Sequence, residues 1–177
     1  MSTMDLQTVT GLLNLDGFEV VEATADAKTK TYRFVVSPTE ALGVCPHCDR
    51  PTADRHECYE RQVVDLPLGG WMTELAVRGF QFHCGPCDKF FTPRQASLAP
   101  TAHATERFLE RLAELATQAE VSTAARFLGV PEKTAETWYY DYLNRRRQEP
   151  AKGLLPIESL GIDELSLKKD TANSSAC

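Results

Sequence analysis

The pattern of apolar and polar positions changes along the chain from strand-like alternation to helical spacing. Apolar residues first recur at helical intervals over residues 5–15, and they then alternate with polar residues in segments 18–20 and 32–34. A polar turn at residues 26–30 separates these two segments. Because alternate side chains of a strand point to opposite faces, the pattern predicts a short helix followed by a β-hairpin.

Two further strands are predicted in the middle of the chain, at residues 61–66 and 72–82. They flank the turn sequence Pro67-Leu68-Gly69-Gly70, which favours a second hairpin. Four alternating residues are expected to share one face of this hairpin: Trp71, Thr73, Leu75 and Val77.

A loop rich in small residues, 96–101, marks the change to helical spacing. Beyond it, residues 105–118 place Phe108, Leu112 and Leu115 on one face of an amphipathic helix. The sequence therefore predicts an α+β protein built of modules in series. These are an N-terminal helix and hairpin (1–40), a small β-rich metal-binding domain (41–95), an all-α domain (101–149) and the start of a further domain (157–177).

Four cysteines in two closely spaced pairs are the strongest chemical signal. Cys45 and Cys48 form one pair, Cys84 and Cys87 form the other, and 35 residues separate the pairs. Each pair spans a short turn that directs two thiolates to one point, and a hairpin can bring the turns together. The spacing predicts a closed four-sulfur site for structural zinc, with no open position for catalysis.

Other interpretations of the cysteines compete with zinc. Cys84-Gly85-Pro86-Cys87 matches the redox pair of thioredoxin-like oxidoreductases, but residues 88–93 are a poor helix and would not lower the pKa of the first thiol. An iron site of the rubredoxin type uses the same four sulfurs. Cys58 could replace one of the four ligands, but it stands alone between the pairs and is interpreted as a small buried residue.

A second motif, from Val121 to Tyr140, has the spacing of a helix-turn-helix. Ala125 stands where the two helices would touch, Gly129 at the turn, and Pro131 where a second helix can begin without its N–H. The second helix, expected over residues 132–143, would be the recognition helix in a major groove. The residues expected to contact DNA in or just beyond it are Lys133, Thr134, Thr137, Tyr140, Arg145, Arg146 and Arg147.

The net charge of -6 does not by itself indicate a nucleic-acid binder, because such domains usually carry a basic surface. Residues 1–40 hold six acids against three bases, so much of the acidic excess lies away from the helix pair. Two or three acids still fall on the outward face of the second helix, and a plain helical packing unit is therefore the alternative to DNA binding. The absence of a signal peptide or a long apolar run indicates a cytoplasmic protein with no membrane partner.

A last apolar stretch, residues 160–169, carries Asp163 and Glu164 on a predicted strand. An acid on a strand is a usual ligand for Mg²⁺ in phosphoryl transfer, although one carboxylate cannot build a two-metal site. A solvated strand end is the alternative interpretation.

Taken in chain order, these motifs resemble the ISL-three family of bacterial insertion-sequence transposases. The matching features are the first cysteine pair, the two middle strands, the second pair with Phe91-Thr92, the helix pair and Gly161-Ile162-Asp163-Glu164. The resemblance runs from about residue 10 to Lys169 and corresponds to the N-terminal half of the family's proteins. In that family a zinc domain and a helix-turn-helix recognise the element ends, and an RNase H-like domain cuts and joins DNA with three acids and Mg²⁺.

The resemblance implies zinc ligation by the four paired cysteines and makes Asp163 the first catalytic acid. It implies double-stranded DNA of the terminal repeats as a partner in the bacterial nucleoid, and a homodimer or the full-length transposase as protein partners. Family members continue through two more acids, whereas this sequence stops at Cys177. We therefore expect a truncated RNase H-like domain, Mg²⁺ binding only if the missing part were present, and no strand cleavage by this chain alone.

The predicted function is sequence-specific DNA binding as the element-end recognition part of a transposase that is catalytically incomplete. A zinc-ribbon helix-turn-helix transcription regulator is the alternative, in which the Asp163 strand is incidental.

Overall fold

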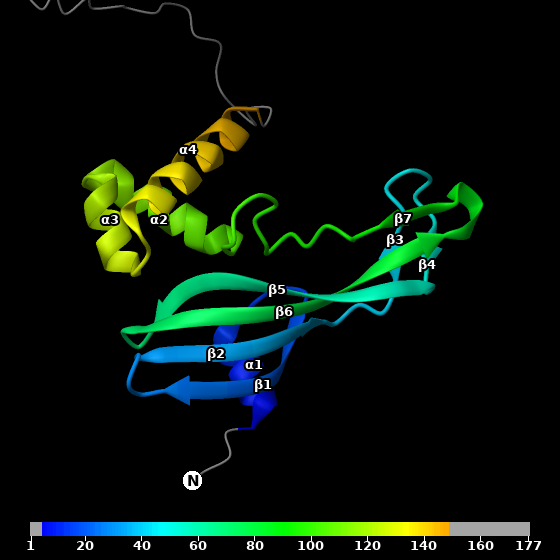
Figure 1. Ribbon diagram of the computed structural model, residues 1–177, viewed down its shortest axis with the longest axis horizontal. Coiled ribbons are helices and arrows are strands. Elements are labelled where there is room, and N and C mark those ends of the chain that lie inside the picture. Colours follow the sequence, from blue (N-terminus) through cyan, green and yellow to red (C-terminus); the bar gives the residue numbers. More distant parts are fainter. Residues whose placement is uncertain (1–4, 149–177) are drawn as a thin grey trace, which may run out of the picture.

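The computed structural model describes residues 5–148, which form a long sheet with helices on both sides (Figure 1). Four α-helices and two sheets make up this part of the chain, so the expected mixture of α and β structure is confirmed. The strand predicted to carry Asp163, and with it the segment 157–177, lies outside the described residues.

The N-terminal helix and hairpin form as the sequence pattern predicts. Helix α1 (Leu6–Leu13) begins after Asp5, whose side chain accepts a hydrogen bond from the backbone N–H of Gln7, and it ends at Asn14 in the left-handed conformation. Strands β1 (Phe18–Asp26) and β2 (Thr31–Pro38) pair antiparallel around the polar turn.

The second hairpin is longer than the sequence pattern predicts. Strands β5 (Arg55–Leu68) and β6 (Trp71–Cys84) pair antiparallel, and the turn between them places Gly69 and Gly70 at φ of 59° and 81°. Positive φ at both central positions is the geometry of a tight hairpin turn, and glycine adopts it without strain. The strands extend to the second cysteine pair because Cys84 is itself the last residue of β6.

One sheet joins the two hairpins. Strand β2 pairs in parallel with β6, which gives the order β1-β2-β6-β5. The expected N-terminal module (1–40) and the expected metal-binding domain (41–95) therefore share one sheet. Buried residues of both hairpins, including Phe34, Val36, Leu75 and Val77, lie in one cluster with Val9 of α1. Covering this shared apolar face with α1 removes it from water, which is the main stabilising contribution available to the sheet.

The opposite face of the sheet carries the helical unit. Val63 packs in the α1 cluster, whereas its neighbour Val64 packs against the helical core, as expected for adjacent residues of a strand. Figure 1 shows α1 and the α2–α4 unit on different sides of the sheet. The backbone N–H of Val64 donates to the carbonyl of His103 at 2.9 Å, and that of Thr105 donates to the carbonyl of Val64 at 3.0 Å. The segment that leads into α2, residues 103–105, is thus hydrogen-bonded to β5.

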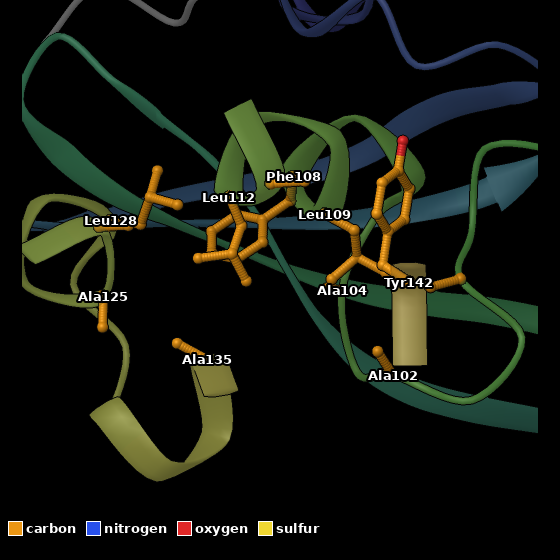
Figure 2. Close-up of a cluster of buried hydrophobic side chains, with 12 residues drawn as sticks. Ala102, Ala104, Phe108, Leu109, Leu112, Ala125, Leu128, Ala135 and Tyr142 are labelled. Atoms are coloured by element: carbon orange, nitrogen blue, oxygen red, sulfur yellow. The ribbon is translucent and has the colours of Figure 1, made fainter. Parts of the chain in front are cut away.

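Three helices form the unit: α2 (Glu106–Gln118), α3 (Val121–Leu128) and α4 (Glu132–Gln148). The hydroxyl of Thr105 caps α2 by accepting from the N–H of Phe108 at 3.3 Å. Phe108 and Leu112 lie at the centre of the buried cluster drawn in Figure 2, and Ala125 and Ala135 lie where α3 meets α4. Small side chains at that contact let the two helices approach closely. Between residues 5 and 148, no helix has the length and apolar character needed to cross a membrane.

Candidate metal centre and helical surface

The structure brings the four paired cysteines together at the end of β6, away from the helical unit (Figure 1). Their Sγ atoms all lie within 4.8 Å of one another, and Cys48 and Cys84 are 3.6 Å apart between Sγ atoms. A tetrahedral zinc ion with bonds of about 2.3 Å needs sulfurs about 3.8 Å apart. The donor set and its spacing therefore fit zinc, and Cys45, Cys48, Cys84 and Cys87 are the residues that would hold it.

The two cysteine turns end alike but differ in their hydrogen bonds. Each ends in an aspartate with left-handed backbone, Asp49 at φ 55° and Asp88 at φ 48°. The N–H of Asp49 donates to the carbonyl of Cys45 at 2.9 Å, and that of Asp88 donates to the carbonyl of Gly85 at 3.2 Å. Aspartate tolerates this conformation better than most residues, which explains its place directly after each pair.

Short strands and two phenylalanines support the turns. Strands β3 (Gly43–Val44) and β4 (Pro51–Thr52) flank the first pair, and the 3₁₀ turn η1 (Gly85–Cys87) leads from the second pair into β7 (Lys89–Phe91). Phe82 and Phe91 stack at 6.0 Å between ring centroids and pack with Cys45 and Cys84. A Cβ at Gly43 would lie 2.8 Å from the Phe82 ring, so this position needs glycine.

The pKa values of the cysteine thiols are shifted in opposite directions within the cluster. Burial acts to raise the pKa of Cys45, but hydrogen bonds from the His47 N–H and from the Cys84 thiol outweigh it and bring that pKa to about 7. The thiol of Cys48, together with burial, raises the pKa of Cys87 to about 12. One thiolate thus forms readily and further ones repel it, and a bound divalent cation removes this repulsion.

His83 connects the second cysteine turn to residues 52–54, which follow the first cysteine turn. Its Nδ1 lies 3.1 Å from Oδ2 of Asp54, and its Nε2 lies 3.1 Å from Oδ1 of Asp88. Its backbone N–H donates to the carbonyl of Asp54 at 2.9 Å, and the Thr52 hydroxyl donates to the His83 carbonyl at 3.0 Å. The sequence showed His83 only as a neighbour of Cys84, because its partners come from a distant segment.

Cys58 is separate from the cluster. The expectation that it is a small buried residue is wrong, because Cys58 is exposed on β5. It pairs across the hairpin with Phe80 of β6.

The segment from Val121 to Tyr140 forms two helices joined by a tight turn. Gly129 ends α3 at φ 72°, and the N–H of Val130 donates to the carbonyl of Ala125 at 3.0 Å. The N–H of Ala135 donates to Pro131 at 3.0 Å, so α4 begins at the expected place. It continues to Gln148 instead of ending near residue 143, because residues 144–148 contain no helix breaker.

The structure sorts the residues predicted to contact DNA by their position around α4. Lys133, Thr137, Tyr140 and Arg147 are exposed and recur at intervals of three, four or seven residues, which places them on one side of the helix. Asn144 is exposed on the same side at the same spacing, although the sequence reading omitted it. We call these five residues the α4 ridge. The sequence contains a signal for Asn144, because it lies four residues after Tyr140 and three before Arg147, on the same side of a helix.

The remaining three predicted residues lie off the ridge. Thr134 is half-buried. Arg145 is half-buried and holds Glu106 of α2 with two hydrogen bonds of 2.7 and 3.2 Å. Arg146 is exposed on the side of α4 that faces the linker and α2, 5.8 Å from the centre of the Tyr142 ring.

Comparison with known proteins shows similarity to a transposase. Over 153 residues the chain is 28% identical to the transposase for insertion sequence element IS1001 from Bordetella parapertussis. The aligned region is 86% of this chain and 37% of that transposase, so the chain spans well under half of the protein it resembles. No protein-family model and no solved structure matches the chain. The similarity supports a function related to transposition.

Proposed function

We propose that this chain is the zinc-binding, DNA-recognising part of an insertion-sequence transposase and that it binds the ends of its element. The α4 ridge carries the proposal. Five exposed residues with hydrogen-bonding or cationic side chains form a continuous row on the second helix of a tight helix pair, and the similarity to the IS1001 transposase indicates the biological setting.

The chemistry of the ridge suits a major groove. From Lys133 to Arg147 it rises about 21 Å along the helix, whereas a major groove is about 12 Å wide. The N-terminal residues can therefore meet base edges while the C-terminal end crosses the backbone. Thr137 can contact a base or a thymine methyl, Asn144 matches the edge of adenine, and the cations at both ends can pair with phosphates.

The metal centre contributes structure and not chemistry in this proposal. Four thiolates occupy all four coordination positions of a tetrahedral zinc ion, which leaves no position for water or substrate. When bound, zinc fixes the two cysteine turns against each other and so shapes the far end of the β5–β6 hairpin as a second surface for the same duplex. The role of Asp163 as a catalytic acid stays a prediction, because that residue lies outside the described residues.

Fluorescence anisotropy with the zinc-loaded protein tests the proposal. The two duplexes are the terminal repeat of the insertion sequence that encodes the chain and a shuffled duplex of equal composition. We expect the repeat to bind at least about 1,000-fold more tightly, which is the low end for specific recognition. Thr137→Ala should reduce the preference for the repeat, and Thr117→Ala on α2 is the matched control. Equal affinity for both duplexes would contradict recognition of the ends.

A zinc-containing transcription regulator could use the same ridge. The two functions differ in the DNA they select, because a regulator would prefer a promoter operator over the element ends. Adding the upstream region of the encoding gene as a third duplex separates them.

A further inference from the structure

The hydroxyl of Thr137, on the α4 ridge, is turned back onto its own helix. Its Oγ1 donates to the carbonyl oxygen of Lys133, one turn earlier in α4, at 3.0 Å. A hydroxyl has one hydrogen to donate, and this bond uses it. The side chain is exposed, so it offers a ligand its methyl group and the lone pairs of an oxygen that already lies against the helix backbone. The methyl is the more accessible of the two.

The position of Thr137 along the ridge suits contact with bases. The cations of the ridge stand at its ends, Lys133 and Arg147, and the three residues between them, Thr137, Tyr140 and Asn144, are uncharged. Phosphates attract cations, whereas the edges of base pairs present neutral groups in the major groove. Thr137 also lies in the N-terminal half of α4, the half that meets base edges in helix-turn-helix proteins.

Tyr140 adds an aromatic ring beside this methyl. Residues three apart in a helix are neighbours on its surface, and Tyr140 is exposed three residues after Thr137. Its ring lies 5.4 Å from that of Tyr139 between centroids, and Tyr139 packs against the core of the helical unit. The Tyr140 ring therefore has an anchored neighbour. The methyl and the ring together form an apolar spot in the middle of an otherwise polar row.

We propose that Thr137 recognises one thymine of the element end through its methyl group, with the Tyr140 ring beside the contact. The inference rests on the proposed function and deepens it by naming the base. The C5-methyl of thymine is the apolar group that an unmodified base pair exposes in the major groove, where the other bases present donors and acceptors. Contact between the two methyls removes both from water, and it leaves the bond from Thr137 to Lys133 intact.

Single-methyl changes on both partners test this contact. Fluorescence anisotropy compares zinc-loaded full chain on the terminal-repeat duplex with duplexes in which one thymine at a time is replaced by deoxyuridine, which lacks only the methyl. We expect one position at which this replacement weakens wild-type binding about fourfold, as for loss of one buried methyl. Thr137→Ser removes the methyl and keeps the hydroxyl, so it should bind both duplexes alike at that position. Thr137→Val keeps a methyl without the hydroxyl and should retain the difference.

Thr117→Ser is the matched control. Thr117 is exposed on α2, and its hydroxyl likewise donates to a backbone carbonyl of its own helix, that of Glu114, at 2.6 Å. This variant should respond to deoxyuridine as the wild type does.

Three outcomes would overturn the methyl contact: Thr137→Ser stays sensitive to the missing methyl, Thr137→Val loses that sensitivity, or no thymine position affects wild-type binding. The proposed function would still stand if the wild-type chain prefers the repeat to the shuffled duplex. If the wild-type chain binds the repeat and the shuffled duplex equally, the proposed function and the methyl contact both fail.

Discussion

Arg107 of α2 forms a bidentate ion pair with the buried carboxylate of Asp65 on β5. Its Nε donates to Oδ1 of Asp65 at 2.8 Å, and its Nη2 pairs with Oδ2. The Thr105 hydroxyl donates to the same Oδ1 at 2.7 Å, and Nη1 of Arg107 donates to the carbonyl of Asn14 at 2.9 Å. This pair links the helical unit, the sheet and the end of α1, and so fixes the ridge relative to the metal end.

Arg107→Ala should destabilise the protein by about 3 kcal/mol, because it leaves the Asp65 carboxylate buried without a cation. Asp65 is only 1% exposed in the intact protein, and Arg107 is its one cationic partner among the described residues. Chemical denaturation measures the change. Arg111→Ala, which removes an exposed cation from the same helix, should cost no more than about 0.5 kcal/mol. Equal effects of the two variants would show that the pair contributes little.

The same pair should make the sheet and the helical unit unfold together. The chain has two tryptophans, Trp71 on β6 and Trp138 on α4, so Trp138→Phe and Trp71→Phe give proteins that report on one region each. We expect the two fluorescence transitions to coincide in these backgrounds and to separate when Arg107→Ala is added. Transitions that already differ with Arg107 in place would contradict this coupling.

Loss of the metal should affect the end of the hairpin more than the helical unit. Within residues 5–148 the apolar side chains of that cluster are buried Phe82 and Phe91 and partly buried Phe80, besides the cysteines, so little apolar burial remains to hold it without zinc. Chelation or Cys48→Ser should speed hydrogen exchange in residues 43–58 and 82–92 and leave the fluorescence of Trp138 unchanged.

Metal analysis supplies the direct check, with one zinc expected per chain. Cys58→Ser is the matched control and should retain its zinc, because Cys58 is exposed and outside the cluster. Iron in place of zinc would give a red protein and would contradict the assignment of the metal.

Gly129→Ala tests the turn between α3 and α4. The added Cβ would lie 2.3 Å from Sδ of Met72, and an alanine would have to keep a φ of 72°. The left-handed conformation alone costs about 1–2 kcal/mol, and moving the flexible Met72 side chain adds to it. Gly69→Ala is the control, because Gly69 has a positive φ of 59° with nothing within 4 Å of an added Cβ.

Thermal and denaturant unfolding should therefore rank Gly129→Ala below Gly69→Ala in stability. Adding Met72→Ala to Gly129→Ala should restore only the part of the lost stability that comes from contact of the new Cβ with Met72. If the double variant is no more stable than Gly129→Ala, contact with Met72 contributes nothing.

Local signals explain which features could be predicted from the sequence. The cysteine pairs, Gly129 and Pro131 each act within a few residues, through turn geometry or a missing N–H, and their positions agree with the structure. The parallel pairing of β2 with β6 has no such signal, because neither strand encodes its neighbour. The same holds for Asp65 and Arg107, which are 42 residues apart in sequence and meet only after the helical unit docks.

Arg145 and Arg147 are two residues apart, and the structure predicts that they serve different purposes. Both were expected to contact DNA, yet Arg145 is turned to Glu106 whereas Arg147 lies on the exposed α4 ridge. Arg145→Ala should destabilise the protein by about 1–2 kcal/mol through loss of a half-buried pair. Arg147→Ala should leave the unfolding midpoint unchanged and weaken DNA binding to all sequences alike, because a phosphate contact carries no sequence information. Denaturation and anisotropy on both variants check this division. If Arg147→Ala unfolds more easily than Arg145→Ala, the assignment of the two side chains is reversed.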